Sequence, residues 1–77
     1  VPDVDMRRFV TLYTLTSAEA DVCKMMMLGL TTEQIAERRD VSPLTVKNQI
    51  SAILSKVGVA RRAEFIRLVM KLLPPVA

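Results

Sequence analysis

Polar side chains of a kind that can read base pairs recur at helical spacing between residues 42 and 55. Lysine can donate to guanine O6 or N7, and asparagine can pair with adenine through two hydrogen bonds. Serine is short enough to let the protein backbone approach DNA closely. One helical surface would collect Leu44, Lys47, Asn48, Ser51 and Ser55. We expect the first four of these residues to face bases. Without their surroundings, Lys47 and Asn48 also fit the solvated face of an ordinary amphipathic helix.

Hydroxyl side chains stand at the start of the same segment. Ser42 followed by Pro43 is a strong helix-start signal, because serine caps well and proline at the first helical position loses no hydrogen bond. A helix N-terminus also suits a phosphate, since its amides are free and its dipole is positive there. We therefore expect Ser42 and Thr45 to lie near DNA phosphates, although helix capping alone would also explain both hydroxyls. Thr32, at the start of the preceding helix, is a further candidate phosphate contact.

Capping signals divide the remaining sequence into helices. The capping-box pattern, in which two residues three positions apart satisfy each other's amides, occurs at Thr16 with Glu19 and at Thr31 with Gln34. Gly58 can take the left-handed conformation that ends a helix. The expected helices span about 17–28, 31–40, 42–57 and 62–73, with a short additional helix before residue 14.

The second and third of these helices are joined by a turn too short for them to lie antiparallel. Ala36 supplies a small side chain where the next helix must approach closely, and Val46, Ile50 and Ile53 form an apolar stripe. A short turn between two such helices is typical of a helix-turn-helix, whose second helix enters the major groove of DNA. The expected fold class is all-α: a four-helix helix-turn-helix domain, with a short extra N-terminal helix as an option.

Composition excludes several functional classes. The 77 residues include one cysteine and no histidine, so we expect no internal disulfide, no metal site and no cofactor. No constellation of catalytic groups and no glycine-rich loop is present, so we expect no enzyme activity. Apolar runs fall short of the roughly 20 residues that span a bilayer, which predicts a soluble, cytoplasmic chain without a membrane partner. The net charge of +3 is modest, but a single acid, Glu64, opposes the basic residues from Lys47 onward.

Several short motifs, in order and with their spacing kept, resemble the helix-turn-helix signature of the LuxR family. No single motif is specific, whereas the complete series from Leu15 to about Leu68 is. The motifs are Leu15-Thr16-Ser17-Ala18-Glu19, Gly29-Leu30-Thr31, Ile35-Ala36-Glu37-Arg38, Val41-Ser42, Thr45-Val46-Lys47, and Ile53 with Lys56-Val57-Gly58-Val59.

The resemblance implies a four-helix DNA-binding domain of a bacterial transcription regulator. Such domains usually follow an N-terminal receiver, autoinducer-binding or other sensory domain, and they bind inverted-repeat double-stranded DNA as homodimers, often through the last helix. The resemblance places the positions of Lys47, Asn48 and Ser51 against bases. It places Lys56, together with Ser42 and Thr45, near the phosphate backbone.

Two residues depart from the family pattern near the expected turn and reading helix. Gln49 stands where many members have histidine, an exchange that keeps a hydrogen bond to the backbone or a neighbouring helix available. Arg39 stands where a helix-turn-helix normally buries an apolar side chain. We expect the stem of Arg39 to pack against the core while its guanidinium reaches solvent. These departures bear on sequence preference and leave the fold unaffected.

The last expected helix has more apolar residues than one buried stripe requires. A symmetric partner could cover the surplus, which makes Phe65, Val69, Leu72 and Leu73 candidate dimerisation residues. Alternatively, the N-terminal segment through Phe9, Leu12 and Tyr13 could fold over this face.

Two other interpretations remain open at this stage. A helix-turn-helix fold can serve as a protein-interaction or dimerisation module that binds no DNA, and the modest charge and apolar last helix fit that reading. A promoter-binding region of a sigma factor shares the helix-turn-helix but fits the segment 56–59 less well. The expected organisation is a linker or short helix at 1–14, the DNA-binding domain at 15–73 and a tail at 74–77.

Overall fold

Five α-helices make up the part of the chain that the structure describes. The structure is a computed structural model, which describes residues 7–72 and every side chain among them except that of Leu72. The helices are α1 (Arg7–Tyr13), α2 (Ser17–Met27), α3 (Thr32–Arg39), α4 (Pro43–Val57) and α5 (Arg62–Leu72). No strand occurs between residues 7 and 72, so the all-α prediction is confirmed, and α1 is the optional short helix. The predicted helix end at Leu73 lies outside the described residues.

Both predicted capping boxes are present. Thr16 Oγ1 accepts from the Glu19 amide at 3.1 Å, and the Thr16 amide donates to Glu19 Oε1 at 2.9 Å. The corresponding distances at Thr31 and Gln34 are 3.2 and 2.9 Å. These bonds satisfy amides that have no partner within the helix, which fixes where α2 and α3 begin.

Left-handed residues end the two helices of the helix-turn-helix. Asp40 follows α3 with φ of 56°, and Gly58 follows α4 with φ of 85°. Glycine takes this conformation without a steric penalty, whereas aspartate is one of the few other residues that tolerate it. The Val41 amide then donates to the Ala36 carbonyl at 3.0 Å, which redirects the chain toward α4 within a few residues.

One apolar core joins all five helices. Its buried residues are Phe9, Leu15, Val22, Cys23, Met26, Ile35, Ala36, Val46, Ile50, Ile53, Phe65 and Val69. Because each helix buries only one stripe, the opposite faces stay available for solvent or a partner. The positions predicted to face the core on α4, Val46, Ile50 and Ile53, are 0%, 9% and 0% exposed.

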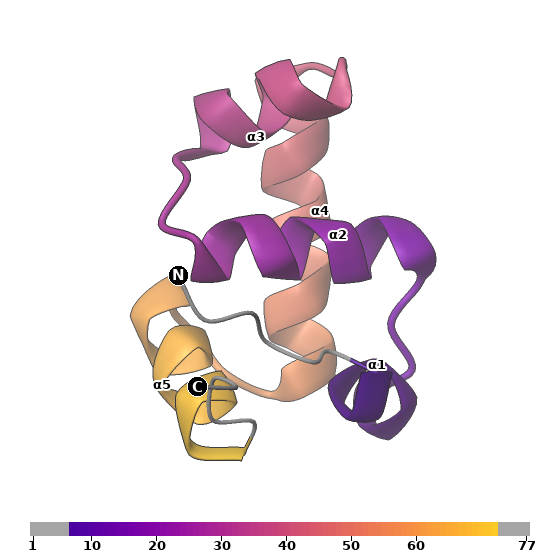
Figure 1. Cartoon of the computed structure of the whole chain (residues 1–77), viewed down its shortest axis with the longest axis vertical. Coiled ribbons are helices and arrows are strands. Elements are labelled where there is room, and N and C mark those ends of the chain that lie inside the picture. Colours follow the sequence, from indigo (N-terminus) through magenta and orange to yellow (C-terminus); the bar gives the residue numbers. More distant parts are fainter. Residues whose placement is uncertain (1–6, 73–77) are drawn as a thin grey trace.

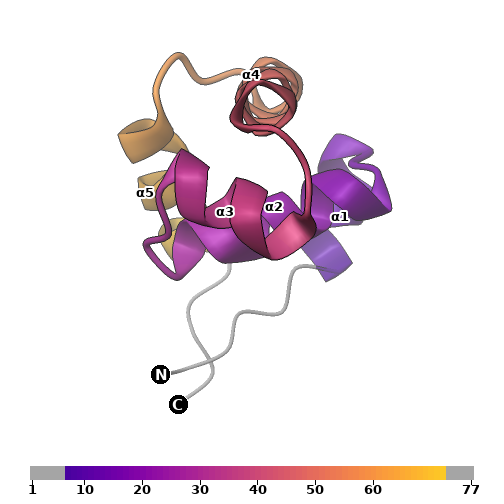
Figure 2. The same ribbon diagram turned by 90° about the horizontal axis from the view of Figure 1, so that it is seen from above.

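The long helix α4 organises the arrangement. In Figure 1, α2 crosses in front of α4, α3 lies beside the upper end of α4, and α1 and α5 flank its lower end. Figure 2, turned by 90°, shows α4 at one edge of the molecule with the other helices to one side. One long face of α4 is therefore left without a neighbouring helix. None of the described helices is long and apolar enough to cross a bilayer.

Candidate nucleic-acid interface

A short turn sets the angle between α3 and α4. The Asp40 amide donates to the Glu37 carbonyl of α3 at 3.3 Å, and the Val41 amide donates to the Ala36 carbonyl at 3.0 Å. Ala36 is 3% exposed and packs within the core, where its small side chain allows close approach of the next helix. The turn therefore holds α4 across α3 and presents the N-terminal end of α4 at the surface, as the sequence predicted.

The start of α4 is built from three residues with separate tasks. Ser42 Oγ accepts from the Thr45 amide at 3.1 Å, and Pro43 occupies the first turn. The Ser42 and Thr45 hydroxyls are also 3.0 Å apart and share one hydrogen bond. Because that bond uses only one of the two hydroxyl protons, the other proton is available for an external acceptor. Both side chains are exposed, so capping and phosphate binding are compatible here.

The expected base-reading residues all lie on the free face of α4. Leu44, Lys47, Asn48 and Ser51 are exposed, and so is Ser55 further along the helix. Their spacing of three or four residues places them on one surface, opposite the buried stripe. The structure thus brings together every side chain that the sequence assigned to base reading.

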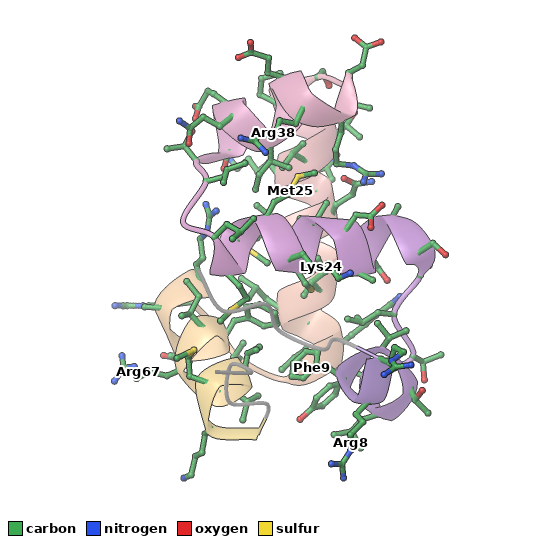
Figure 3. All side chains as sticks on the ribbon, in the orientation of Figure 1. Arg8, Phe9, Lys24, Met25, Arg38 and Arg67 are labelled. Atoms are coloured by element: carbon green, nitrogen blue, oxygen red, sulfur yellow. The ribbon has the colours of Figure 1, made fainter. Side chains whose placement is uncertain are left out.

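The electrostatics of this face favour an anion. No acidic residue occurs anywhere in α4, and its N-terminus, the positive end of the helix dipole, carries the Ser42 cap. Lys47 adds a formal positive charge within the exposed face. Figure 3 shows Lys24 and Arg38 on the side of α2 and α3 that faces the viewer, whereas α4 runs behind these helices. Those two cations therefore belong to a different surface.

Lys56 makes an ion pair that the resemblance does not imply. Its ammonium donates to Glu19 Oε1 at 2.6 Å and lies 3.5 Å from the Thr14 carbonyl. The Glu19 side chain is 9% exposed and that of Lys56 37%. This ion pair joins the C-terminal end of α4 to the start of α2, so Lys56 holds the reading helix against α2. The phosphate contact that the resemblance implies for Lys56 stays a prediction.

The sequence identified Glu19 only as a capping residue and missed its partner on α4. Burial raises the pKa of the Glu19 carboxyl, but hydrogen bonds from Lys56 and from the Thr16 amide and hydroxyl, together with the Lys56 charge, outweigh burial and lower it overall. The carboxylate is therefore the stable form in the folded chain. Because 37 residues separate the two partners, no local spacing could have signalled the pair.

Three further residues near the interface have defined positions. Thr32 is half-buried in the first turn of α3, so it is less accessible to a phosphate than Ser42. The Arg39 side chain is 19% exposed, and its guanidinium, which we expected to reach solvent, donates to Asp21 on α2 at 3.2 Å. Gln49 Oε1 is buried without a hydrogen-bond partner among the described residues, so this oxygen does not make the expected bond.

The predicted dimerisation residues on α5 are wrong where the structure describes them. Phe65 and Val69 are both 0% exposed and lie in the core. The Phe9 ring of α1 packs edge-on against the Phe65 ring at a centroid distance of 5.5 Å, so the N-terminal segment covers this face. Side chains of Leu72 and Leu73 lie outside the described part. The alternative considered from the sequence is thus the correct one for Phe65.

A short turn, a small buried residue at the helix crossing and a free, acid-free second helix define a helix-turn-helix DNA-binding domain. A family model described as bacterial regulatory proteins, luxR family, matches residues 13–69, and the chain belongs to this family. Membership of this family makes it a DNA-binding domain of the kind found in bacterial transcription regulators.

Curated relatives come from mycobacteria. The chain is 40% identical over 50 residues to the DNA-binding transcriptional activator DevR/DosR of Mycobacterium tuberculosis, covering 65% of this chain and 23% of the relative. It is 36% identical over 53 residues to the putative HTH-type transcriptional regulator Mb0914c of Mycobacterium bovis, covering 69% of this chain and 6% of the relative. The chain thus spans about a quarter or less of these proteins. No solved structure matches it.

Proposed function

We propose that α4 reads a specific DNA sequence through the residues Leu44, Lys47, Asn48 and Ser51. The observation that carries this assignment is the free face of α4, which holds all four side chains and no acid. Lys47 has the chemistry to donate to guanine and Asn48 the chemistry to pair with adenine, and such contacts discriminate between base pairs. A protein-docking face of the same size would more often carry aromatic or clustered aliphatic anchors.

Phosphate contacts in this proposal come from the start of α4. Ser42 and Thr45 supply the unused hydroxyl proton, and the helix dipole adds a favourable field for the anion. Thr32 has a smaller part, since it is half-buried. Phosphate contacts fix the register of the protein on the duplex, while base contacts determine the sequence that is bound.

We further propose that two copies of the chain occupy inverted half-sites of one duplex. One reading face with a single free lysine makes few ionic contacts, so a pair of linked half-sites would raise the affinity through effective concentration. Two-fold symmetry places the half-sites about one helical turn, roughly 34 Å, apart. Contacts between the copies exclude Phe65 and Val69, which the core already buries.

In the same proposal, the domain works inside a longer bacterial regulator in the cytoplasm. The matched segment is 23% of one relative and 6% of another, and we place sensory or receiver domains of such a regulator on the N-terminal side. Such a domain would control when α4 reaches DNA. The proposed domain itself performs binding and no catalysis.

The experiment is duplex binding at a series of salt concentrations. We compare the wild type with the double variant Lys47→Ala and Asn48→Ala, and use Lys24→Ala as the charge control because it removes one positive charge from the opposite side of the molecule. Wild type is expected to bind random duplex DNA with an affinity that falls steeply as salt rises. The double variant is expected to lose at least about tenfold in preference for a selected sequence, and the control to lose less than about twofold.

Two results would contradict the proposal. Equal losses in the double variant and in the Lys24→Ala control would mean that net charge, and not the α4 face, determines binding. An absence of salt-dependent binding by the wild type at low ionic strength would support the protein-interaction module instead.

A further inference from the structure

We propose that Leu44 recognises the C5-methyl group of a thymine, so that each half-site carries a thymine next to the bases read by Lys47 and Asn48. This inference rests on the proposed function of the α4 face and specifies part of the sequence that the face selects. It gives an apolar side chain at the start of the reading helix a defined ligand on DNA.

The first observation is the exposure of Leu44. Its side chain is 65% exposed, and it belongs neither to the buried core nor to the apolar side chains packed against that core. A single exposed leucine has little meaning by itself. Leu44, however, lies in the first turn of α4, whose free face has no acidic residue and carries side chains that can read bases.

The second observation is the polar surroundings of Leu44. Leu44 lies between Pro43 and Thr45 in the first turn, after the Ser42 cap, and Lys47 and Asn48 follow it one turn later on the same face. The other large exposed apolar residues with more than half of their surface accessible, Leu12 and Leu28, belong to α1 and to the end of α2. Leu44 is therefore set apart from these two leucines, and the other side chains expected to read bases on its face are polar.

The chemistry of the major groove leaves one good partner for such a group. Of the four bases, thymine alone presents a methyl group there, while the other three bases present only donors and acceptors in that groove. A leucine placed over cytosine, guanine or adenine would remove water from polar base edges without replacing their hydrogen bonds. Leu44 accordingly favours thymine and disfavours cytosine, which differs from thymine at this edge by its amino group and its missing methyl.

Helix geometry places this thymine relative to the other contacts. Three or four residues along α4 correspond to a rise of about 4.5 to 6 Å, and successive base pairs are about 3.4 Å apart. Leu44 would thus contact a base one or two pairs away from those contacted by Lys47 and Asn48. The expected half-site has a thymine at that distance from a guanine or an adenine.

The test begins with the 77-residue chain and a library of random DNA duplexes. Bound duplexes are enriched and sequenced, and each thymine of the resulting consensus is then replaced in turn by deoxyuridine, which removes only the methyl group. Wild type is expected to lose about fourfold in affinity at one thymine of each half-site, the value of one buried methyl group, and little at the others.

Variants of Leu44 complete the test. Leu44→Ala is expected to lose affinity for the thymine duplex, so that it binds the thymine and deoxyuridine duplexes with the same affinity. Leu44→Met is expected to keep the preference for the methyl group. Leu28→Ala is the matched control, since it truncates an exposed leucine at the C-terminal cap of α2. Circular dichroism of each variant verifies that the fold is retained.

The outcomes separate the inference from the proposed function. If a consensus emerges but no thymine is sensitive to deoxyuridine, or if Leu44→Ala keeps that sensitivity, the assignment of Leu44 is overturned while DNA reading stands. If no consensus emerges from the wild type, the proposed function fails and takes the inference with it.

Discussion

Removing the ion pair between Glu19 and Lys56 should destabilise the chain without disturbing the helix cap that Glu19 also forms. The substitution Glu19→Gln keeps a side-chain oxygen for the Thr16 amide, because Gln34 makes the same bond to the Thr31 amide at 2.9 Å in α3. The reciprocal substitution, Lys56→Met, keeps the apolar stem and removes the ammonium. Together the two substitutions and their combination form a double-mutant cycle.

The magnitude follows from the geometry of the pair. Exposed ion pairs contribute about 0.2–1 kcal/mol, while hydrogen bonds to charged groups in proteins contribute about 1.5–3 kcal/mol. The 2.6 Å bond joins a nearly buried carboxylate, 9% exposed, to an ammonium side chain that is 37% exposed and therefore partly screened by water. We expect an intermediate coupling free energy of about 1.5 kcal/mol. A loss of that size lowers Tm by roughly 6–12 °C in a domain of this length.

Urea unfolding of the four proteins measures this coupling. The pH dependence gives a second measurement, since the lowered pKa of Glu19 means that the folded chain favours the carboxylate. The contribution of the Glu19 carboxylate to stability is fully present above its ordinary pKa of 4.5. This contribution is lost as the pH falls through the lower pKa that Glu19 has in the folded chain. Glu19→Gln should therefore lose less stability than wild type between about pH 5 and pH 3. A coupling below about 0.3 kcal/mol, or identical acid profiles for wild type and Glu19→Gln, would refute this reasoning.

Three further predictions concern the core and the helix ends. Val69→Ala should cost about 2 kcal/mol in urea unfolding, independently of protein concentration, because Val69 is buried within one chain. Asp40→Gly should raise Tm by a few degrees in thermal unfolding, since glycine relieves the left-handed φ of 56° and removes an acid from the negative end of α3. Cys23 should resist iodoacetamide in the native chain and react in urea, because burial, with a smaller effect of the Glu19 charge, raises the pKa of its thiol to about 12.

Each of these predictions has an opposing result. If the free energy of unfolding of Val69→Ala rose with protein concentration, α5 would be a dimer interface after all. A lower Tm for Asp40→Gly would mean that the aspartate side chain makes a contact worth more than the relief of its backbone. Rapid alkylation of Cys23 in buffer at neutral pH would show that α2 opens readily.

Local sequence signals were sufficient to predict the helices and the free face of α4. The two capping boxes and the serine-proline start depend on residues within four positions of one another, so they could be recognised without knowledge of the fold. The free face of α4 followed from the periodicity of its buried stripe, Val46, Ile50 and Ile53. The low exposure of the Arg39 side chain, 19%, also agrees with its expected position in the motif, whereas its ion pair with Asp21 was not predicted.

Contacts between distant segments were the part that local signals could not predict. The surplus of apolar residues on α5 was visible, but whether α1 or a second chain covers Phe65 depends on tertiary packing. Phe9, 56 positions earlier in the sequence, provides the cover through an edge-to-face ring contact. The ion pair of Lys56 was missed for the same reason, because its partner Glu19 lies on another helix.

The position of Lys56 has a consequence for where DNA can contact α4. With its ammonium bound to Glu19, the C-terminal half of α4 has no free cation, and its last turn carries the negative end of the helix dipole. The N-terminal half has the positive dipole end, an unused hydroxyl proton at Ser42 and Thr45, and Lys47. A polyanion is therefore attracted to the first two turns of the helix, and we expect Ser55, although exposed, to contribute far less to binding than Lys47. Comparing Ser55→Ala with Ser51→Ala in the duplex binding assay tests that gradient, and equal effects would mean that α4 lies along the groove instead of entering it by its N-terminus.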